Sequence, residues 1–212
     1  FLDWLERVLT PLAKVIGENK YLVAIRDGFL LSTPLLIVGS VFLLIANFPL
    51  PQWDTWMSHL LGKDWATMMS VPASASFDVM TILAVVGIAY SLGKQFNVDA
   101  MQAGIIALVS FFIVTPYQTL FTPENSSKVY EVTSLPLKWM GSSGLFLGMI
   151  VALIATRLFV AIVRKGWTIK MPEGVPPTVV KSFEALIPSF LVVTLMFLVN
   201  WLAVLTPYGN LP

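Results

Sequence analysis

Long runs of apolar residues alternate with shorter polar segments along this chain. A bilayer core of about 30 Å is crossed by roughly 20 mostly apolar residues in a helix. Each run should be helical, because unpaired backbone groups are costly in hydrocarbon, and the two-residue alternation of a membrane barrel is absent from the sequence. The pattern predicts five membrane-spanning helices, at residues 29–48, 75–92, 103–121, 144–163 and 188–205.

Two segments outside these runs are amphipathic. In residues 1–28 apolar side chains recur at helical spacing, which indicates a helix on the cytoplasmic membrane surface; a helix packed on another soluble domain is the alternative. Pro177 can occupy the first position of a second surface helix, and Pro188 can begin or kink the helix after it. We therefore expect residues 164–187 to form a cytoplasmic elbow with a short amphipathic helix, which leads into the fifth span within residues 188–212.

The remaining polar segments are predicted to be long outer loops, near residues 49–74 and 122–143, between the four spans of residues 29–163. These loops contain four tryptophans: Trp53, Trp56, Trp65 and Trp139. Tryptophan near the end of a span typically anchors the helix at the membrane interface. Stacking on a sugar ring is the functional alternative, and the sequence does not decide between the two.

The composition supports the membrane class and argues against nucleic-acid binding, metal binding and catalysis. The chain is 57% hydrophobic and only 12% charged, with a mean hydropathy of +0.81; soluble domains carry about 25% charged residues. We predict an all-α integral membrane protein. A net charge of +1 with scattered basic residues argues against nucleic acid as a partner. There is no cysteine and only one histidine, His59, so we predict no metal site, no cofactor and no catalysis by this chain.

The basic residues predict which way the chain crosses the membrane. Nine of them lie before the first span, between the second and third, or between the fourth and fifth, and three lie in the alternate loops. Cytoplasmic loops carry the excess of lysine and arginine. We therefore expect a multi-pass membrane protein with its N-terminus in the cytoplasm and its C-terminal end outside.

Charged residues within or beside the spans are the candidate functional residues, because a charge in lipid is expensive. Asp78 is predicted in the first turn of its helix, near the outer face, where the helix dipole favours a carboxylate. Arg157 lies in the inner third of its span and could reach the interface or pair with Asp27. Arg26 and Asp27 precede Gly28 at the mouth of the first span. They could form a neutralised anchor for the helix. The alternative is a contact with a moving domain or with a cytoplasmic partner.

Three stretches of the chain resemble one family. These are VAIRDGFLLSTPLLIVGS at residues 23–40, FDVMTILAVVGIAYSLGK at 77–94 and MPEGVPPTVVKSFEALIP at 171–188. Together they resemble the sugar-permease C component of bacterial phosphotransferase systems, in the lactose, cellobiose and diacetylchitobiose branch. The resemblance covers essentially the whole chain, and PEGVPP is its most specific part.

The resemblance implies a permease of roughly ten spans, of which this chain is the N-terminal scaffold and dimer-interface half. It implies that a β-linked disaccharide is carried inward by the other half and phosphorylated by the B component, with phosphate from phosphoenolpyruvate. No position here matches the family's sugar-contacting Glu and His, so the substrate-binding residues are expected mainly beyond residue 212. The elbow with Glu173 is expected on the face where the B component docks.

Two other classes of function stay open at this stage. One is a membrane scaffold protein that transports nothing. The other is an ion-coupled secondary transporter in which Asp78 and Arg157 are the coupling groups. Both chain ends look like cuts, so we expect the natural protein to be longer.

Overall fold

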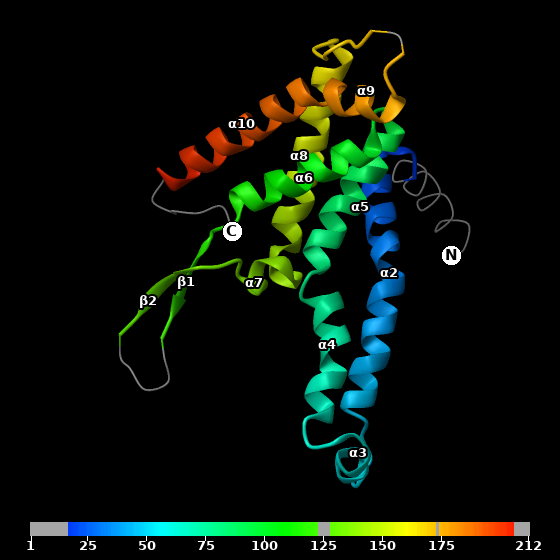
Figure 1. Ribbon diagram of the computed structural model, residues 1–212, viewed down its shortest axis with the longest axis vertical. Helices are drawn as coiled ribbons and strands as arrows, with labels where there is room; N and C mark the ends of the chain where they lie inside the picture. The colour runs from blue at the N-terminus through cyan, green and yellow to red at the C-terminus, as the bar shows by residue number, and fades with distance from the viewer. Residues whose placement is uncertain (1–16, 123–127, 173, 206–212) are drawn as a thin grey trace, which may run out of the picture.

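Helices dominate the computed structural model, which describes residues 17–122, 128–172 and 174–205. Residues 1–16, most of the predicted N-terminal surface helix, lie outside the described residues. In chain order the elements are α2 (Lys20–Ala46), α3 (Trp53–Leu61), α4 (Trp65–Phe77), α5 (Met80–Gln95), α6 (Ala100–Val114), β1 (Gln118–Phe121), β2 (Tyr130–Thr133), α7 (Leu137–Met140), the 3-10 helix η1 (Ser142–Gly144), α8 (Leu145–Arg164), α9 (Pro177–Glu184) and α10 (Leu186–Val204) (Figure 1).

Within the described residues, four helical segments are long and apolar enough to cross a membrane: Lys20–Ala46, Trp65–Gln95, Ser142–Arg164 and Pro177–Val204. The predicted membrane-helix class is therefore confirmed. The third predicted span matches α6, which has only 15 residues and so rises about 22 Å, less than the hydrocarbon thickness of about 30 Å. Five full spans are therefore not confirmed.

The third predicted span was too long because a proline ends α6. Thr115 follows the last helical residue with φ −89° and ψ 134°, the extended conformation that a following proline, here Pro116, imposes on its neighbour. The chain then enters β1, which pairs antiparallel with β2 from Gln118↔Thr133 to Phe121↔Tyr130. This hairpin was not predicted, and it replaces the end of the expected span and part of the expected loop 122–143.

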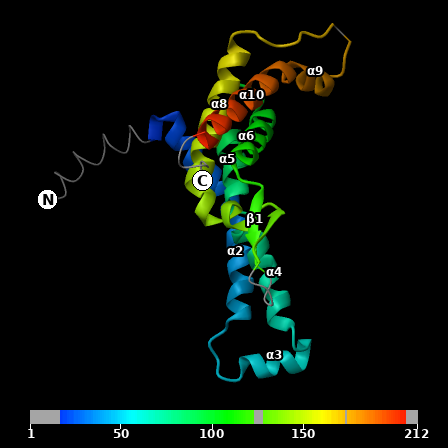
Figure 2. The same ribbon diagram turned by 90° about the vertical axis from the view of Figure 1, so that its left-hand side faces the viewer.

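The predicted first outer loop was also wrong, because residues 53–61 and 65–77 form α3 and α4. Trp65 is 1% exposed and donates its indole N–H to Asp54 Oδ1 at 3.0 Å, so it joins α3 to α4. In both views α3 lies at the far end of the α2–α4 pair, away from the other helices (Figures 1 and 2).

Helix α2 begins at Lys20 rather than at residue 29, so residues 20–28 belong to the first apolar helix. Asn19 caps it, since its side-chain oxygen accepts hydrogen bonds from the N–H groups of Tyr21 and Leu22. The N-terminal part of α2 packs on α5 and its C-terminal part packs on α4. One long helix thus holds both halves of the Trp65–Gln95 segment.

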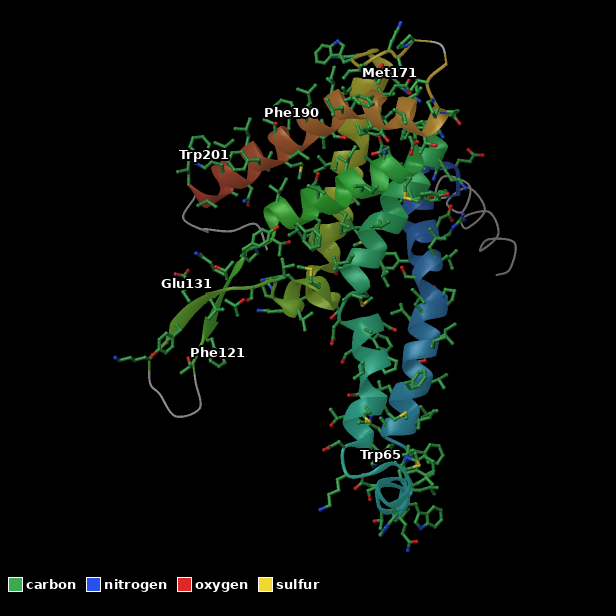
Figure 3. All side chains as sticks on the ribbon, in the orientation of Figure 1. Trp65, Phe121, Glu131, Met171, Phe190 and Trp201 are labelled. Atoms are coloured by element: carbon green, nitrogen blue, oxygen red, sulfur yellow. The ribbon has the colours of Figure 1, made fainter. Side chains whose placement is uncertain are left out.

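The core lies around α5, which packs against α2, α6 and α8. Its buried residues include Val85, Ile88 and Leu92, each with no exposed surface. Helix α10 packs on α6 and α8 through Val192 and Met196, while Phe190 and Trp201 project from its outer face (Figure 3). Small residues such as Ala84 and Ala89 let these backbones approach closely.

Helices α9 and α10 follow one another with only Ala185 between them. Pro177 is the first residue of α9, where its missing N–H costs no hydrogen bond. Pro188 falls in the first turn of α10 rather than before it, so α10 begins at Leu186. The N–H of Ser189 reaches past this proline to the Ala185 carbonyl at 2.8 Å.

Candidate functional site

Helices α2 and α5 cross at two glycines, beside the predicted pair Arg26 and Asp27. A Cβ on Gly28 would lie 2.5 Å from the backbone nitrogen of Ile88, and a Cβ on Gly87 would lie 2.6 Å from the Gly28 carbonyl oxygen. Only glycine permits an approach this close. The crossing holds the polar mouth of α2 against the last turns of α5.

Asp27 is the centre of a small polar cluster at this mouth. Arg26 donates from Nε at 2.9 Å and from Nη2 at 2.8 Å to Asp27 Oδ1, and Ser91 Oγ donates to Asp27 Oδ2 at 3.4 Å. A cavity of about 320 Å³ opens beside it and is lined by Asp27, Leu30, Leu31, Tyr90, Ser91 and Lys94. The Lys94 ammonium lies 5.1 Å from the centroid of the Tyr90 ring.

This cluster is suited to anchoring and polar contact. The Arg26 and Asp27 side chains are 62% and 37% exposed, and exposed ion pairs contribute at most about 1 kcal/mol. Among the described residues, no group of three or more His, Cys, Asp and Glu side chains could hold a metal ion. The Asp27 carboxylate and the Lys94 ammonium both stand at the edge of this mostly apolar cavity.

The structure does not bring Arg157 to Asp27, the partner that the sequence suggested. Asp27 is occupied by Arg26 on its own helix. The Arg157 guanidinium instead lies 5.2 Å from the centroid of the Phe96 ring, and the Arg164 guanidinium lies 5.1 Å from the same centroid. Both arginines point from α8 to the residue that caps the C-terminal end of α5.

Asp78 is not in the first turn of a helix, as predicted, but at a break between two. It caps the C-terminal end of α4, donating its N–H to the Ser74 carbonyl at 2.9 Å, and α5 begins at Met80. Gly141 lies beside it, since a Cβ there would be 3.5 Å from Asp78 Cα. The adjoining Thr81 hydroxyl donates to the Gly141 carbonyl at 2.5 Å, which ties the break to the segment before α8.

The elbow is held to the α5–α6 connection by a long ion pair. Lys181 Nζ lies 3.9 Å from Asp99 Oδ2, and Asp99 also caps α6 by accepting from the Gln102 N–H at 3.0 Å. A cavity of about 200 Å³ lies between these elements and α8, with Asp99, Lys181 and Glu184 on its wall. The predicted Glu173 lies outside the described residues.

The sequence analysis missed Lys20, Phe96 and Arg164, which meet Arg157 at one end of the bundle. Each lies at a helix end or in a connection, and each looks ordinary by itself. No spacing rule connects residues 20, 96 and 164, so only the packing of α2 and α8 on α5 reveals the cluster.

Comparison with known proteins gives one consistent answer. Residues 26–211 match the family model described as Phosphotransferase system, EIIC. The chain is 41% identical over 211 residues to the "PTS system cellobiose-specific EIIC component" of Geobacillus stearothermophilus, covering 99% of this chain and 47% of that protein. It is also 41% identical to the "Lichenan permease IIC component" of Bacillus subtilis (strain 168), covering 98% and 46%.

A solved structure agrees with these sequence matches. The fold superposes with a TM-score of 0.92 and 41% identity on the crystal structure of the transporter ChbC, the IIC component from the N,N'-diacetylchitobiose-specific phosphotransferase system, covering 98% of this chain and 48% of that one. The chain spans about half the length of the relatives it matches.

Proposed function

Because the chain belongs to the phosphotransferase system EIIC family, we propose that it is the scaffold and dimerisation half of a bacterial sugar permease. The permease carries a β-linked disaccharide of the cellobiose, diacetylchitobiose or lactose type. The observation that carries this proposal is the 41% identity, over 99% of the chain, to a protein named as a cellobiose-specific EIIC component.

The proposed division of labour follows from what this half contains. Charged side chains are few along the apolar helices, and the described residues offer the Asp27 cluster and the Asp78 break rather than a continuous polar path. A sugar needs many polar contacts, so we place the sugar site in the rest of the permease, mainly beyond residue 212. This half then serves as the rigid support against which the sugar-bearing half moves.

The large exposed apolar surface supports the proposal that other molecules or segments cover this scaffold on several sides. Only 11% of the most apolar part of α2 is buried, and its exposed residues include Leu30, Leu35, Ile37 and Val41. Lipid, the other half of the permease and a second copy are the available neighbours. We propose a homodimer, which crosslinking in membranes tests; failure to trap any dimer would contradict it.

The end of the bundle that carries Lys20, Lys94, Arg164 and Lys181 is proposed to face the cytoplasm, by the positive-inside rule. The B component would dock there and phosphorylate the incoming sugar, with phosphate that originates from phosphoenolpyruvate. This chain itself performs no chemistry in the proposal.

Sugar uptake by the full-length permease tests the proposed function. In cells, we expect labelled cellobiose or diacetylchitobiose to accumulate as the phosphorylated sugar, and only when the B component is present. Accumulation of free disaccharide without the B component would contradict the proposal. Uptake that stops when the proton gradient is collapsed, and in Asp78→Asn, would instead favour an ion-coupled transporter.

Lys181→Ala tests whether α9 touches the B component. The Lys181 side chain is 64% exposed and its pair with Asp99 is long, so we expect stability to fall by less than about 1 kcal/mol. If α9 is part of the docking face, B-component affinity should fall roughly fivefold or more, measured by calorimetry with the full-length permease. Lys138→Ala, on α7 at the other end of α8, is the control. Unchanged affinity in Lys181→Ala would assign α9 a purely structural role.

A further inference from the structure

Three cationic side chains, one from α2 and two from α8, surround the Phe96 ring. The Lys20 ammonium lies 4.7 Å from the ring centroid, and the Arg157 and Arg164 guanidinium carbons lie 5.2 Å and 5.1 Å from it. Because all three distances are measured to the same centroid, any two of the charged centres are separated by at most the sum of their two distances. We call these three residues with Phe96 the cation cluster.

None of the three cations of the cluster forms an ion pair with a carboxylate of residues 17–122, 128–172 and 174–205. The ion pairs formed there are Arg26 with Asp27 and Lys181 with Asp99. Lys20 Nζ donates to the Gln95 carbonyl and Arg164 Nη2 to the Phe96 carbonyl, both at 3.3 Å. These bonds satisfy two backbone carbonyl groups at the C-terminal end of α5. Three positive charges nevertheless remain beside one another.

Arg157 has donors to spare in this arrangement. The Arg157 guanidinium carbon lies over the face of the Phe96 ring, and its N–H groups, which lie in the plane of the guanidinium, have no hydrogen-bond acceptor among the described residues. A planar guanidinium with free N–H groups is well suited to binding phosphate oxygens. A second arginine and a lysine next to it increase the attraction for an anion.

An apolar groove begins where the cation cluster ends. It has a volume of about 360 Å³ and is lined by Tyr21, Leu153, Ile154, Arg157 and Leu158. Arg157 thus belongs both to the cluster and to the groove. The groove runs along α8 toward the middle of the helix, on the side where Ile154 is 47% exposed.

From these two features, we propose that the protein binds an anionic phospholipid at this place, with the phosphate at Lys20, Arg157 and Arg164 and one acyl chain in the groove. A basic pocket between membrane helices that opens on an apolar surface has the chemistry of a lipid headgroup site. A soluble phosphate or a phosphorylated peptide would make no use of the apolar groove. The lipid would link α2, α5 and α8 at the end proposed to face the cytoplasm.

Native mass spectrometry of the detergent-purified full-length permease tests this proposal. Phosphatidylglycerol and phosphatidylcholine with the same two oleoyl chains are added at equal concentration. We expect phosphatidylglycerol to bind preferentially. Its affinity should fall roughly fivefold in Arg157→Gln and about 25-fold in Arg157→Gln/Arg164→Gln, since one basic residue near the surface is worth about a fivefold change in binding. Lys165→Gln is the matched control, because the Lys165 ammonium lies over the Trp167 ring instead.

Two further measurements separate lipid from other anions and from misfolding. Ile154→Asn should also weaken phosphatidylglycerol binding, because it places an amide in the acyl groove, whereas excess inorganic phosphate should not displace the lipid. Equal binding of both lipids to the unaltered protein would overturn the proposal without any variant. So would unchanged binding in the double arginine variant, or displacement by inorganic phosphate, which would identify a site for a soluble anion.

Discussion

Replacing Gly28 with leucine is expected to prevent α2 and α5 from packing. A Cβ at residue 28 would lie 2.5 Å from the backbone nitrogen and 2.7 Å from Cα of Ile88. Backbone atoms in the middle of α5 cannot yield as a flexible side chain can. Overpacking typically costs 1–3 kcal/mol, and here we expect at least about 3 kcal/mol, because the two helices must separate.

Thermal unfolding of the purified chain in detergent, followed by size-exclusion chromatography, measures this effect. Gly28→Leu should yield little monodisperse protein or a much lower melting temperature. Gly104→Ala is the control, since its Cβ would make only ordinary contact, 3.4 Å from Val86 Cγ1. A melting temperature for Gly28→Leu equal to that of the control would show that the α2–α5 crossing is looser than described.

The second large effect is expected from Phe111→Ala. Phe111 has no exposed surface, and its ring fits against Gly148 of α8, where a Cβ would lie 3.7 Å from Cε2. Deleting a buried ring removes its packing contacts and leaves a cavity between α6 and α8. Such changes cost about 3–5 kcal/mol, and titration with a denaturing detergent would measure the free energy of unfolding.

Phe146→Ala provides the comparison for this effect. Phe146 is 71% exposed, so its removal creates no internal cavity, and we expect a change below about 0.5 kcal/mol. Similar losses in the two variants would mean that α6 and α8 are not packed as tightly as the burial of Phe111 indicates.

Sequence reasoning predicted the apolar helices well where apolar length alone decides them. The fourth predicted span, residues 144–163, matches α8 at Leu145–Arg164, and the fifth, residues 188–205, matches α10 at Leu186–Val204. Both are long apolar runs with clear polar ends. In such runs the backbone must form its own hydrogen bonds, and the helix is the local solution.

The errors share a cause, which is local chemistry that hydropathy does not weigh. Pro116 ends α6 through Thr115, and a hairpin follows. Residues 65–77 form α4 despite Pro72 and several serines, because their small side chains pack on α2, as the contact of Ser76 with Gly39 illustrates. Asp78 therefore lies at a break between helices rather than at the start of one.

The contacts of the candidate site were also predicted where the residues are adjacent in sequence and missed where they lie on different helices. Arg26 and Asp27 were found because they are adjacent, and they do pair. The suggested pairing of Arg157 with Asp27 was wrong, because the packing of α8 directs Arg157 to Phe96. The distance between two side chains on different helices depends on crossing geometry, which the sequence of either helix does not contain.

By itself, the sequence determined that this is a helical membrane protein and which family it resembles. The length of an apolar run and a local sequence motif are both properties of a single segment. Only the tertiary structure decided that Lys20, Arg157 and Arg164 gather at Phe96 and that an apolar groove adjoins them. The physical reason is close packing: Gly28 and Gly87 let α2 approach α5, and small residues bring α8 to its other side. That approach places Lys20 beside two arginines that lie 137 and 144 residues further along the sequence, around one ring.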